Sequence, residues 1–468
     1  MDASHYEILP DAVFYPKDLY DLQKVCKYSH AKKVPITPRG AGTGLLGQSL
    51  SGGIIVDFTK HMNKIVEIEE DHVVVQPGVI KGMLDRELKK RNKFLPPDPA
   101  SSNFCTIGGM IADNSSGVHC LAYGSTIDFL VGIDAVYADG EAGFARADRF
   151  DSKSERLEKL LSPHLDLIKN GYPKVSKNSC GYRLDAVMSD KFMPHKVFAA
   201  SEGTLGLVTS AELRILDTPV YRCMVVFGFE DLLTAILAVP HVLKFSPVAL
   251  EILDHTVLPA GRTENTGCLM FVEFAGNNTR IEDRLTTCIE ELAGRCSVIE
   301  YASDEQSMAN IWRARKGALN EVMKLAVGSR KPIGLIEDTV VPPQLLSDHA
   351  ANLLKIYREN KLEYVMYGHA GNGNLHTRPL VDTNSAEDAD LVQRIAGTVF
   401  RQVISAGGTI TGEHGDGIAR VGFIEMMYGK KIAGLFSLVK RVFDPKFLMN
   451  PGKKVPCKST SQRKADVE

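Results

Sequence analysis

The sequence lacks the features that anchor a protein in a membrane or bind it to nucleic acid. No apolar run in its 468 residues approaches the roughly 20 residues needed to span a bilayer. The most apolar region, residues 223–243, is interrupted by Glu230, Asp231 and Pro240. Lysine and arginine (55) balance aspartate and glutamate (57), so the basic excess typical of nucleic-acid-binding proteins is missing. We therefore expect no nucleic-acid partner and a protein that acts on small molecules.

Paired cysteines and a secretory leader are missing as well. The nine cysteines are scattered without a C-x-x-C pair, which argues against a bound iron–sulfur cluster and against a disulfide framework. The first five residues contain no basic stretch followed by an apolar one, so we expect no secretory signal. These absences predict a cytoplasmic protein. Any association with a membrane is expected to be peripheral, through a partner.

Helical and strand patterns alternate along the first half of the chain. Residues 17–32 carry apolar side chains at helical spacing, and Pro16 suits a helix start. Residues 79–92 predict a second helix. Residues 53–58 and 72–75 are β-branched runs bounded by turn residues, so they predict strands. The pattern indicates an α+β or α/β fold without repeats.

A domain boundary is expected near residues 216–219, where one apolar strand ends and the next begins at Tyr221. From there to about Ile418 strands and helices continue to alternate, including a helix expected at 232–243 and a strand at 363–367, which indicates a separate α+β substrate domain. A last helix is expected at 422–443. The chain is expected to divide into residues 1–218, residues 219–421, a C-terminal segment 422–457 that returns to the first domain, and a disordered polar tail, 458–468.

A glycine-rich turn, Arg39-Gly40-Ala41-Gly42-Thr43-Gly44, follows a predicted strand. Glycines allow backbone N–H groups to approach an anion such as a pyrophosphate closely. The signal is weak by itself, because glycine-rich loops are often plain turns. Residues 45–51 hold further turn formers instead of opening a helix, so a nicotinamide-binding Rossmann unit is disfavoured.

Later segments, taken in order, add a more specific signal. They are Pro97-Asp98-Pro99-Ala100-Ser101, Thr106-Ile107-Gly108-Gly109, Ser115-Ser116-Gly117, Lys177-Asn178-Ser179-Cys180-Gly181-Tyr182 and Glu202-Gly203-Thr204-Leu205-Gly206. Together they resemble the FAD-binding domain of the vanillyl-alcohol oxidase and p-cresol methylhydroxylase superfamily. Within it they resemble the D-lactate dehydrogenase, glycolate oxidase and D-2-hydroxyglutarate dehydrogenase group. The resemblance runs from about Pro16 to Lys453 and implies an α+β fold, with a two-part FAD-binding domain and an α+β substrate (cap) domain.

The resemblance also implies which residues contact FAD. The turn would wrap the pyrophosphate, residues 97–109 would line the path of the flavin, residues 202–209 would close the site, and Asn450 would return from the C-terminal segment. The implied residues are Arg39, Gly40, Ala41, Gly42, Thr43, Gly44, Pro97, Asp98, Ser101, Thr106, Gly108, Gly109, Ser115, Gly117, Glu202, Gly203, Gly206, Val208 and Asn450.

The chain departs from the family pattern at two positions near the expected cofactor. Met110 stands where relatives commonly have asparagine, and Ser115-Ser116-Gly117 stands where they have Ala-Gly-Gly. No histidine lies in a loop typical of covalent flavin attachment; His61 and His119 are the nearest candidates, and we interpret both as surface or packing residues. We therefore expect dissociable FAD.

Two strings in the second half carry histidines and a carboxylate. His369 and His376 flank a glycine-rich turn, while Glu413 and His414 lie in a second one. Two imidazoles and one carboxylate suit a borderline divalent ion with positions left open for a substrate. The resemblance makes His369, His376 and Glu413 metal ligands, with zinc expected and manganese or iron as alternatives, and makes His414 the catalytic base. Asn372 stands where many relatives have aspartate.

Three basic residues are candidates for binding a substrate carboxylate. Arg315 aligns best with the family's substrate arginine, Arg378 follows His376 by two positions, and Lys331 precedes another family string at 337–342. An arginine can bind a carboxylate through two hydrogen bonds, which a lysine cannot.

The resemblance implies an FAD-dependent dehydrogenase that oxidises a small D-2-hydroxy acid, D-lactate or glycolate, to the 2-oxo acid. The metal would lower the pKa of the substrate hydroxyl, His414 would accept its proton, and a hydride would pass to flavin N5. D-2-Hydroxyglutarate dehydrogenase and a non-catalytic flavin subunit of a glycolate oxidase complex are the alternatives. A zinc hydrolase would leave the flavin-like half unexplained, and a non-redox flavoenzyme should lack the metal residues. The electron acceptor (an iron–sulfur subunit, a cytochrome, a quinone or an electron-transfer flavoprotein) stays open, as does a homodimer.

Overall fold

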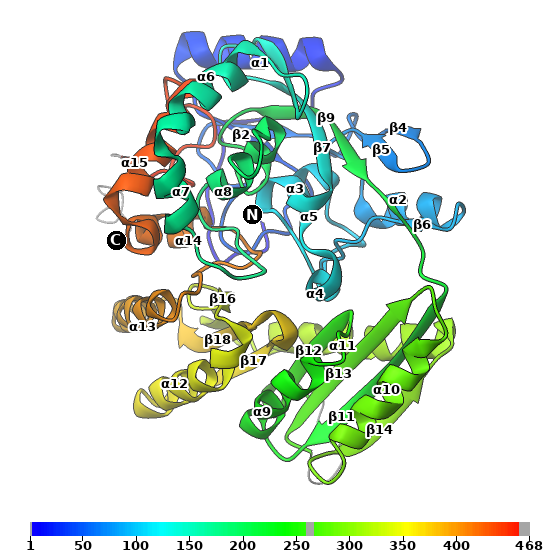
Figure 1. Cartoon of the computed structure of the whole chain (residues 1–468). Helices are drawn as coiled ribbons and strands as arrows, with labels where there is room; N and C mark the ends of the chain where they lie inside the picture. The colour runs from blue at the N-terminus through cyan, green and yellow to red at the C-terminus, as the bar shows by residue number, and fades with distance from the viewer. Residues whose placement is uncertain (1, 259–265, 458–468) are drawn as a thin grey trace.

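The first half of the chain forms two sheets (Figure 1) in a computed structural model that describes residues 2–258 and 266–457. The tail predicted to be disordered, 458–468, lies outside the described residues. A small parallel sheet has the order β1-β3-β2. Its strands are β1 (Ala12–Phe14), β2 (Ile36–Arg39) and β3 (Ile54–Asp57). The glycine-rich turn therefore begins at the carboxyl end of β2, where backbone N–H groups can meet a ligand.

A larger antiparallel sheet follows, with the order β4-β5-β9-β7-β8. Its strands are β4 (Ile65–Ile68), β5 (His72–Val75), β7 (Leu130–Val136), β8 (Ala142–Arg146) and β9 (Leu207–Arg214), and a short ribbon pairs β6 (Lys93–Phe94) with β10 (Leu216–Asp217). The helices of this half are α1 (Leu19–Lys32), α2 (Lys81–Lys89), α3 (Ile107–Asp113), α4 (Cys120–Tyr123), α5 (Thr126–Phe129), α6 (Ser152–Leu161), α7 (Leu165–Gly171) and α8 (Leu184–Val187).

The helix predicted over residues 17–32 is present as α1, but it begins two residues later. The side chain of Asp18 accepts a hydrogen bond from the backbone N–H of Asp21 and caps the helix, so the start is set by this N-cap and not by Pro16. The predicted helix at 79–92 is likewise shorter, because Ile80 is already extended.

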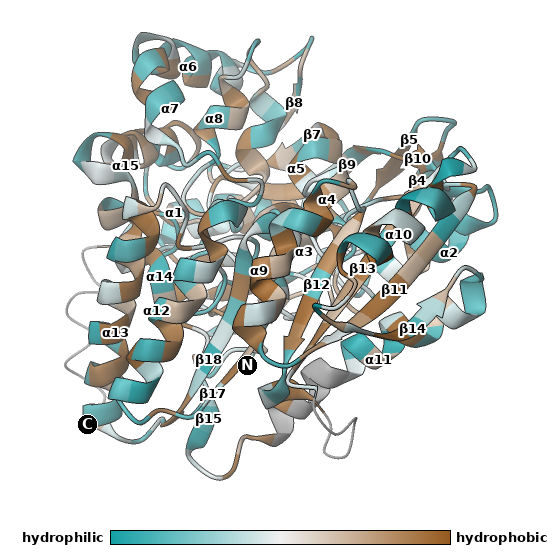
Figure 2. Ribbon diagram, turned by 60° about the horizontal axis from the view of Figure 1, so that its bottom comes forward, coloured by the Kyte–Doolittle hydropathy of each residue, from teal (hydrophilic) through white to brown (hydrophobic). Residues whose placement is uncertain are grey.

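An eight-stranded sheet forms the centre of the second half, with the order β14-β11-β13-β12-β17-β18-β15 and β16 paired to β18. Its strands are β11 (Tyr221–Phe229), β12 (Ala249–Asp254), β13 (Cys268–Gly276), β14 (Ser297–Ala302), β15 (Arg330–Pro332), β16 (Thr339–Val340), β17 (Tyr364–His369) and β18 (Asn374–Asp382). Figure 2 shows β11, β12 and β13 largely in the colour of hydrophobic residues, because both faces of the sheet are covered.

Helices cover the two faces unequally. One face packs against α9 (Leu232–Leu243), α10 (Arg280–Glu291) and α12 (Leu346–Glu359). The other face carries a second apolar cluster with α11 (Glu305–Lys324), in which Phe271 stacks on Trp312. On that second face the register places His369, Glu251 and Phe271 in one row across β17, β12 and β13. This face thus carries the polar side chains of Glu251 and His369, and the sheet lies next to the first half (Figure 1).

The chain ends by returning to the first half. After α13 (Ala386–Ser405) and α14 (Gly417–Arg420), helix α15 (Ile424–Phe443) packs against α6 and α7. The predicted helix at 422–443 is therefore present, with a break at Gly429, whose φ is +72°. None of the described helices is long and apolar enough to cross a bilayer.

Candidate active site

One cavity of about 560 Å³ joins the glycine-rich turn of the first half to the histidine strings of the second. Most residues predicted to form a site line it. They are Arg39, Gly40, Ala41, Gly42, Thr43, Gly44, Asp98, Ser101, Thr106, Gly108, Gly109, Ser115, Gly117, Glu202, Gly203, Gly206, Val208, Arg315, Arg378, His369, His376, Glu413 and His414. Segments almost 400 residues apart in sequence therefore share one space.

Three predicted residues do not line this cavity. Lys331 is exposed on β15, away from the histidines. Pro97 is buried behind Asp98. Asn450 lies behind the wall, where its amide donates hydrogen bonds to the backbone carbonyls of Gln48 (2.8 Å) and Glu202 (2.6 Å).

The glycines of the turn are required by close packing. A Cβ on Gly40 would lie 2.1 Å from Oγ1 of Thr106, and Gly42 has a φ of +70°. Thr106 in turn caps α3 by accepting a hydrogen bond from the backbone N–H of Gly109. The turn and the start of α3 thus meet at the small side chain of Thr106, and the cavity wall beside them is lined largely by glycines, which leaves a groove.

His369, His376 and Glu413, here named the His/Glu cluster, lie together at the other end of the cavity. Nε2 of His369 is 2.8 Å and Nε2 of His376 is 3.3 Å from Oε1 of Glu413. Ligand atoms bound at about 2.1 Å to a four- or six-coordinate ion lie about 3.0 to 3.4 Å apart. The three atoms therefore have nearly the separation that one divalent ion needs.

Buried charges fix the protonation of the cluster. Burial lowers the pKa of His376 to about 4, so its imidazole is neutral, the form that binds metals. Burial alone would raise the pKa of Glu413, but the Lys177 ammonium and His369 hold it well below its ordinary value. Nδ1 of His369 donates to Oε1 of Glu251 over 2.6 Å, the kind of contact that orients a metal-binding histidine.

His414 is held by a carboxylate of its own. Its Nδ1 donates to Oε1 of Glu337 over 2.8 Å, and its Nε2 lies 4.0 Å from Oε1 of Glu413. Burial lowers the pKa of His414, but Glu337 and Asp338 outweigh it and raise the pKa to about 9. Nε2 is therefore the atom of His414 that can give or take a proton beside the cluster.

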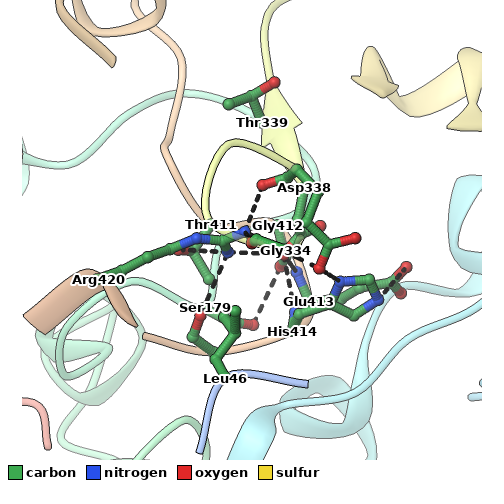
Figure 3. A network of polar contacts seen from close by, with 12 residues as sticks. Leu46, Ser179, Gly334, Asp338, Thr339, Thr411, Gly412, Glu413, His414 and Arg420 are labelled. Carbon is green, nitrogen blue, oxygen red and sulfur yellow. Dashed lines mark hydrogen bonds and ion pairs between the residues drawn. The ribbon is translucent and has the colours of Figure 1, made fainter. Parts of the chain in front are cut away.

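The loop that carries Glu413 and His414 is fixed through Asp338 (Figure 3). Oδ2 of Asp338 accepts hydrogen bonds from the backbone N–H groups of Glu413 (2.9 Å) and His414 (2.8 Å). The fully buried Arg420 binds the side chain of Thr411 and the backbone carbonyl of Gly334. The loop backbone that carries Glu413 and His414 is thus held in place by hydrogen bonds.

Arg315 and Arg378 line the cavity on either side of Tyr367. Nη2 of Arg315 donates to Glu251 over 2.6 Å, and its Nε has no hydrogen-bond partner in the described part of the chain. Nε of Arg378 donates to Oε2 of Glu337 over 3.0 Å. Each guanidinium therefore keeps donors that a ligand in the cavity can use.

Several functional residues escaped the sequence analysis. Glu251 and Glu273 interrupt strands that are otherwise apolar, β12 and β13, and a buried charge in such a strand is a usable signal because it needs a partner. Lys177 and Glu337 stand in strings that carry the family resemblance, 177–182 and 337–342, but neither residue was given a role there. Their importance comes from contacts that only the tertiary structure makes.

His119, interpreted from the sequence as a surface or packing residue, is one member of a buried polar group. Its Nδ1 lies 2.7 Å from Asp98 in the first half and its Nε2 3.1 Å from Glu273 on β13. Glu273 also accepts hydrogen bonds from Trp312 and Arg222. His119 thus connects Asp98, in the loop that lines the cavity, to the eight-stranded sheet of the second half.

The departures from the family pattern have distinct surroundings. Met110 and Ser115 line the cavity. The hydroxyl of Ser116 donates to Oε2 of Glu413. Asn372 points away from the His/Glu cluster and donates to Oγ of Ser176 over 2.8 Å, so the missing charge of the usual aspartate is not compensated at the cluster.

Comparisons with known proteins were made for both halves. The family described as "FAD binding domain" matches residues 10–143, and the family "FAD linked oxidases, C-terminal domain" matches residues 218–454. D-2-Hydroxyglutarate dehydrogenase of Haemophilus influenzae is 31% identical over 97% of this chain and 48% of its own length. Glycolate oxidase subunit GlcD of Bacillus subtilis is 30% identical over 96% of this chain and 89% of its own. A probable mitochondrial D-lactate dehydrogenase of Danio rerio is 28% identical over 95% and 84%.

The chain spans about half the length of the D-2-hydroxyglutarate dehydrogenases that it matches. Among solved structures, 4-ethylphenol oxidase from Gulosibacter chungangensis has a TM-score of 0.69 at 14% identity, covering 96% of this chain and 90% of that one. p-Cresol methylhydroxylase has a TM-score of 0.66 at 15% identity, covering 95% and 88%. At these identities the likeness concerns the fold alone.

Proposed function

The chain belongs to the family of FAD-linked oxidases, and from this membership we propose that it is an FAD-dependent dehydrogenase that oxidises a D-2-hydroxy acid to the 2-oxo acid. The predicted fold, an FAD-binding part of the vanillyl-alcohol oxidase type with an α+β cap, is confirmed. The division at residues 218, 421 and 457 is retained as part of the proposal.

The single observation that carries the proposal is the shared cavity. It brings a glycine-rich turn suited to a pyrophosphate into the same space as two histidines, a glutamate and two arginines. A non-catalytic cofactor-binding protein would need only the glycine-rich turn. A metal hydrolase would need only the histidines, the glutamate and the arginines. The two groups together fit a flavin that reacts with an acid held at a metal.

FAD fits the first group of residues. The turn 39–44 would hold the pyrophosphate, residues 98–109 and 115–117 the flavin, and residues 202–208 would close the site; Asn450 supports it from behind by fixing Gln48 and Glu202. The glycine-lined groove at Gly40 and Thr106 supports this, since any side chain there would fill it. This mode of binding needs no covalent bond from FAD to a lysine or a histidine, so FAD is proposed to be dissociable.

A divalent ion, with zinc proposed and manganese or iron as alternatives, fits the His/Glu cluster. One neutral imidazole and one imidazole oriented by Glu251 each lie within 3.3 Å of one oxygen of an ionised carboxylate, and the three ligand atoms lie within 4.8 Å of one another. The set leaves coordination positions for a hydroxyl and a carboxylate, as a catalytic site requires. When bound, the ion lowers the pKa of a coordinated hydroxyl and the flavin accepts the hydride.

The chain's own residues supply binding and proton transfer. Arg315, through its free Nε, and Arg378 would hold the substrate carboxylate. Nε2 of His414, beside the cluster, would take the hydroxyl proton. His414 must first lose its own proton, and it does so more easily when a cation occupies the cluster, because like charges repel.

D-Lactate and glycolate are the proposed substrates, with D-2-hydroxyglutarate as the alternative. Relatives named for all three acids match the chain over more than nine-tenths of its length. Three relatives are named as oxidase subunits. This supports an electron acceptor on another protein, and it keeps a role as one subunit of a complex as the second candidate. The protein itself is proposed to be cytoplasmic, at a membrane only through such a partner.

An anaerobic screen of 2-hydroxy acid enantiomers tests the proposal. The FAD-loaded chain should lose its oxidised-flavin absorbance with achiral glycolate, or with a D-acid and not with its L-enantiomer. A chelator should abolish the bleaching while flavin stays bound, and zinc should restore it. Flavin that no 2-hydroxy acid bleaches, with zinc present, contradicts the proposed activity and favours the non-catalytic subunit.

A further inference from the structure

The two carboxylate oxygens of Glu413 face opposite halves of the protein. Oε1 points to two histidines of the eight-stranded sheet and lies 2.8 Å from Nε2 of His369 and 3.3 Å from Nε2 of His376. Oε2 accepts hydrogen bonds from Nζ of Lys177 over 2.9 Å and from the hydroxyl of Ser116. Oε1 therefore faces the two other proposed metal ligands, while Oε2 is held by the first half.

Both groups that hold Oε2 belong to the FAD-binding half. Ser116 lies between α3 and α4, and Lys177 lies between α7 and α8. Their side chains are fully or almost fully buried. Lys177 makes no other hydrogen bond or ion pair in the described part of the chain, and the hydroxyl of Ser116 also lies within hydrogen-bonding reach of the Cys120 thiol. Two buried donors directed at a single oxygen form a built contact and not an incidental one.

We propose that Lys177 and Ser116 are positioning residues that make Glu413 a one-oxygen metal ligand. They hold Oε2 on the FAD-binding side, so that Oε1 alone meets the ion, and the metal site is complete only when the eight-stranded sheet rests on the FAD-binding half. This inference rests on the proposed function and adds to it the residues that shape the metal site from the flavin side.

The two residues act in different ways. Ser116 contributes an uncharged hydrogen bond that orients the carboxylate. Lys177 adds a positive charge, which draws electron density toward Oε2. Together the two donors fix the orientation of Oε1 before the ion binds, so the loss of either one should cost metal affinity.

The first test compares Ser116→Ala with Ser154→Ala in the full-length, FAD-loaded chain. Both substitutions remove one buried hydroxyl, but Oγ of Ser154 on α6 has no hydrogen-bond partner among the described residues. Zinc affinity is measured by competition with a chromophoric chelator. We expect Ser116→Ala to weaken zinc binding about tenfold, while Ser154→Ala leaves it unchanged and both variants retain FAD.

The second test follows coordination directly in Lys177→Met, which has a side chain of similar length and no charge. Cobalt(II) replaces zinc, and the flavin is bleached with dithionite so that the visible bands of the metal can be read. Freeing Oε2 should let both oxygens bind, which raises the coordination number and weakens those bands relative to wild type. Lys177→Arg, which keeps the charge and the donor, should restore them.

Zinc affinity and cobalt bands that match wild type in Ser116→Ala and Lys177→Met would overturn the proposal. If Lys177→Met does not fold, the Ser116→Ala affinity decides alone. A wild-type chain that binds no zinc overturns the positioning role together with the metal site. A wild-type chain that binds zinc but is bleached by no 2-hydroxy acid contradicts only the proposed activity, since the affinity difference between the serine variants still stands.

Discussion

The carboxylate of Glu337 accepts hydrogen bonds from two side chains: Nδ1 of His414 lies 2.8 Å from its Oε1, and Nε of Arg378 lies 3.0 Å from its Oε2. A single buried carboxylate thus orients the proposed base and one proposed substrate arginine together. Electrostatic attraction holds the three groups together. Arg378 and His414 outweigh the effect of burial and keep the pKa of Glu337 well below its ordinary value. Glu337 therefore links the pKa of His414 to the binding of substrate by Arg378.

Glu337→Gln should move the pH dependence of flavin reduction to lower pH. The carboxylate raises the pKa of His414 to about 9 against the effect of burial, and the base form of His414 grows as pH rises through that value. Removing the charge lowers the pKa, by about 1 unit or more, so reduction should reach its plateau at lower pH. Stopped-flow reduction between pH 6 and 10 measures this, and a rising limb that stays at the wild-type pH contradicts the assignment.

His414→Ala should retain FAD and lose turnover. Among the described residues the side chain of His414 bonds to Glu337 and not to the glycine-rich turn, so the flavin spectrum is expected to stay, whereas flavin reduction should slow by about 10²- to 10⁴-fold without a positioned base. His255→Ala, on the same half but largely exposed, is the control and should reduce normally. A His414→Ala variant that is reduced at a near-normal rate removes His414 from the mechanism.

Arg315→Lys should raise KM for the acid with little change in kcat. The free Nε of Arg315 has no counterpart in lysine, and a hydrogen bond to a charged group contributes about 1.5–3 kcal/mol, so KM should rise roughly ten- to hundredfold. Arg313→Lys is the matched control on the same helix, because Arg313 is exposed and contacts only Asn310 there. Equal KM values for the two variants would place the substrate carboxylate elsewhere.

Much of the fold follows from local patterns in the sequence. The helix expected at 232–243 has those bounds as α9, because Asp231 caps it and its apolar face is continuous. The strand that delivers His369 was also predictable from residues 363–367. Both depend on neighbours within a few turns, where periodicity and capping decide the outcome.

The contacts that shape the site were not predictable in the same way. Lys177 and Glu413 are 236 positions apart, and their pairing depends on how one half rests on the other. Glu251 reaches His369 because β12 pairs with β17, although 118 residues separate them. Lys331, chosen from its place before a family string, proved to lie on an exposed edge strand. Sequence patterns identify the functional strings but not the sheet register that brings them together.

Gly40→Ala should weaken FAD binding without unfolding the protein. An added Cβ would lie 2.1 Å from Oγ1 of Thr106, and overpacking of this kind costs about 1–3 kcal/mol, which should lower FAD affinity roughly ten- to hundredfold. Gly52→Ala is the control, since a Cβ there meets nothing within 4 Å. Equilibrium titration of the apoprotein with FAD measures both. Equal affinities would mean that the groove at Gly40 does not hold the cofactor.

His119→Gln should remove a pH-dependent part of the stability. Burial lowers the pKa of His119, but Asp98 and Glu273 outweigh it and raise the pKa to about 10, above the 6.5 of an unfolded chain. A raised pKa stabilises the folded state fully below pH 6.5, and this contribution is lost as pH rises toward 10. Breaking a buried charge pair costs about 3–5 kcal/mol. Wild type should therefore exceed the variant by about that amount at pH 6, and the gap should narrow steadily up to pH 10.

Urea unfolding of both proteins at several pH values measures the gap. His72→Gln serves as the control, because His72 pairs with an exposed aspartate on the surface, and its unfolding free energy should follow wild type throughout. A gap between His119→Gln and wild type that is constant from pH 6 to 10 would mean that His119 is neutral in the folded protein. Its two carboxylate contacts would then be ordinary hydrogen bonds, and the link between the loop of Asp98 and the eight-stranded sheet would not depend on charge.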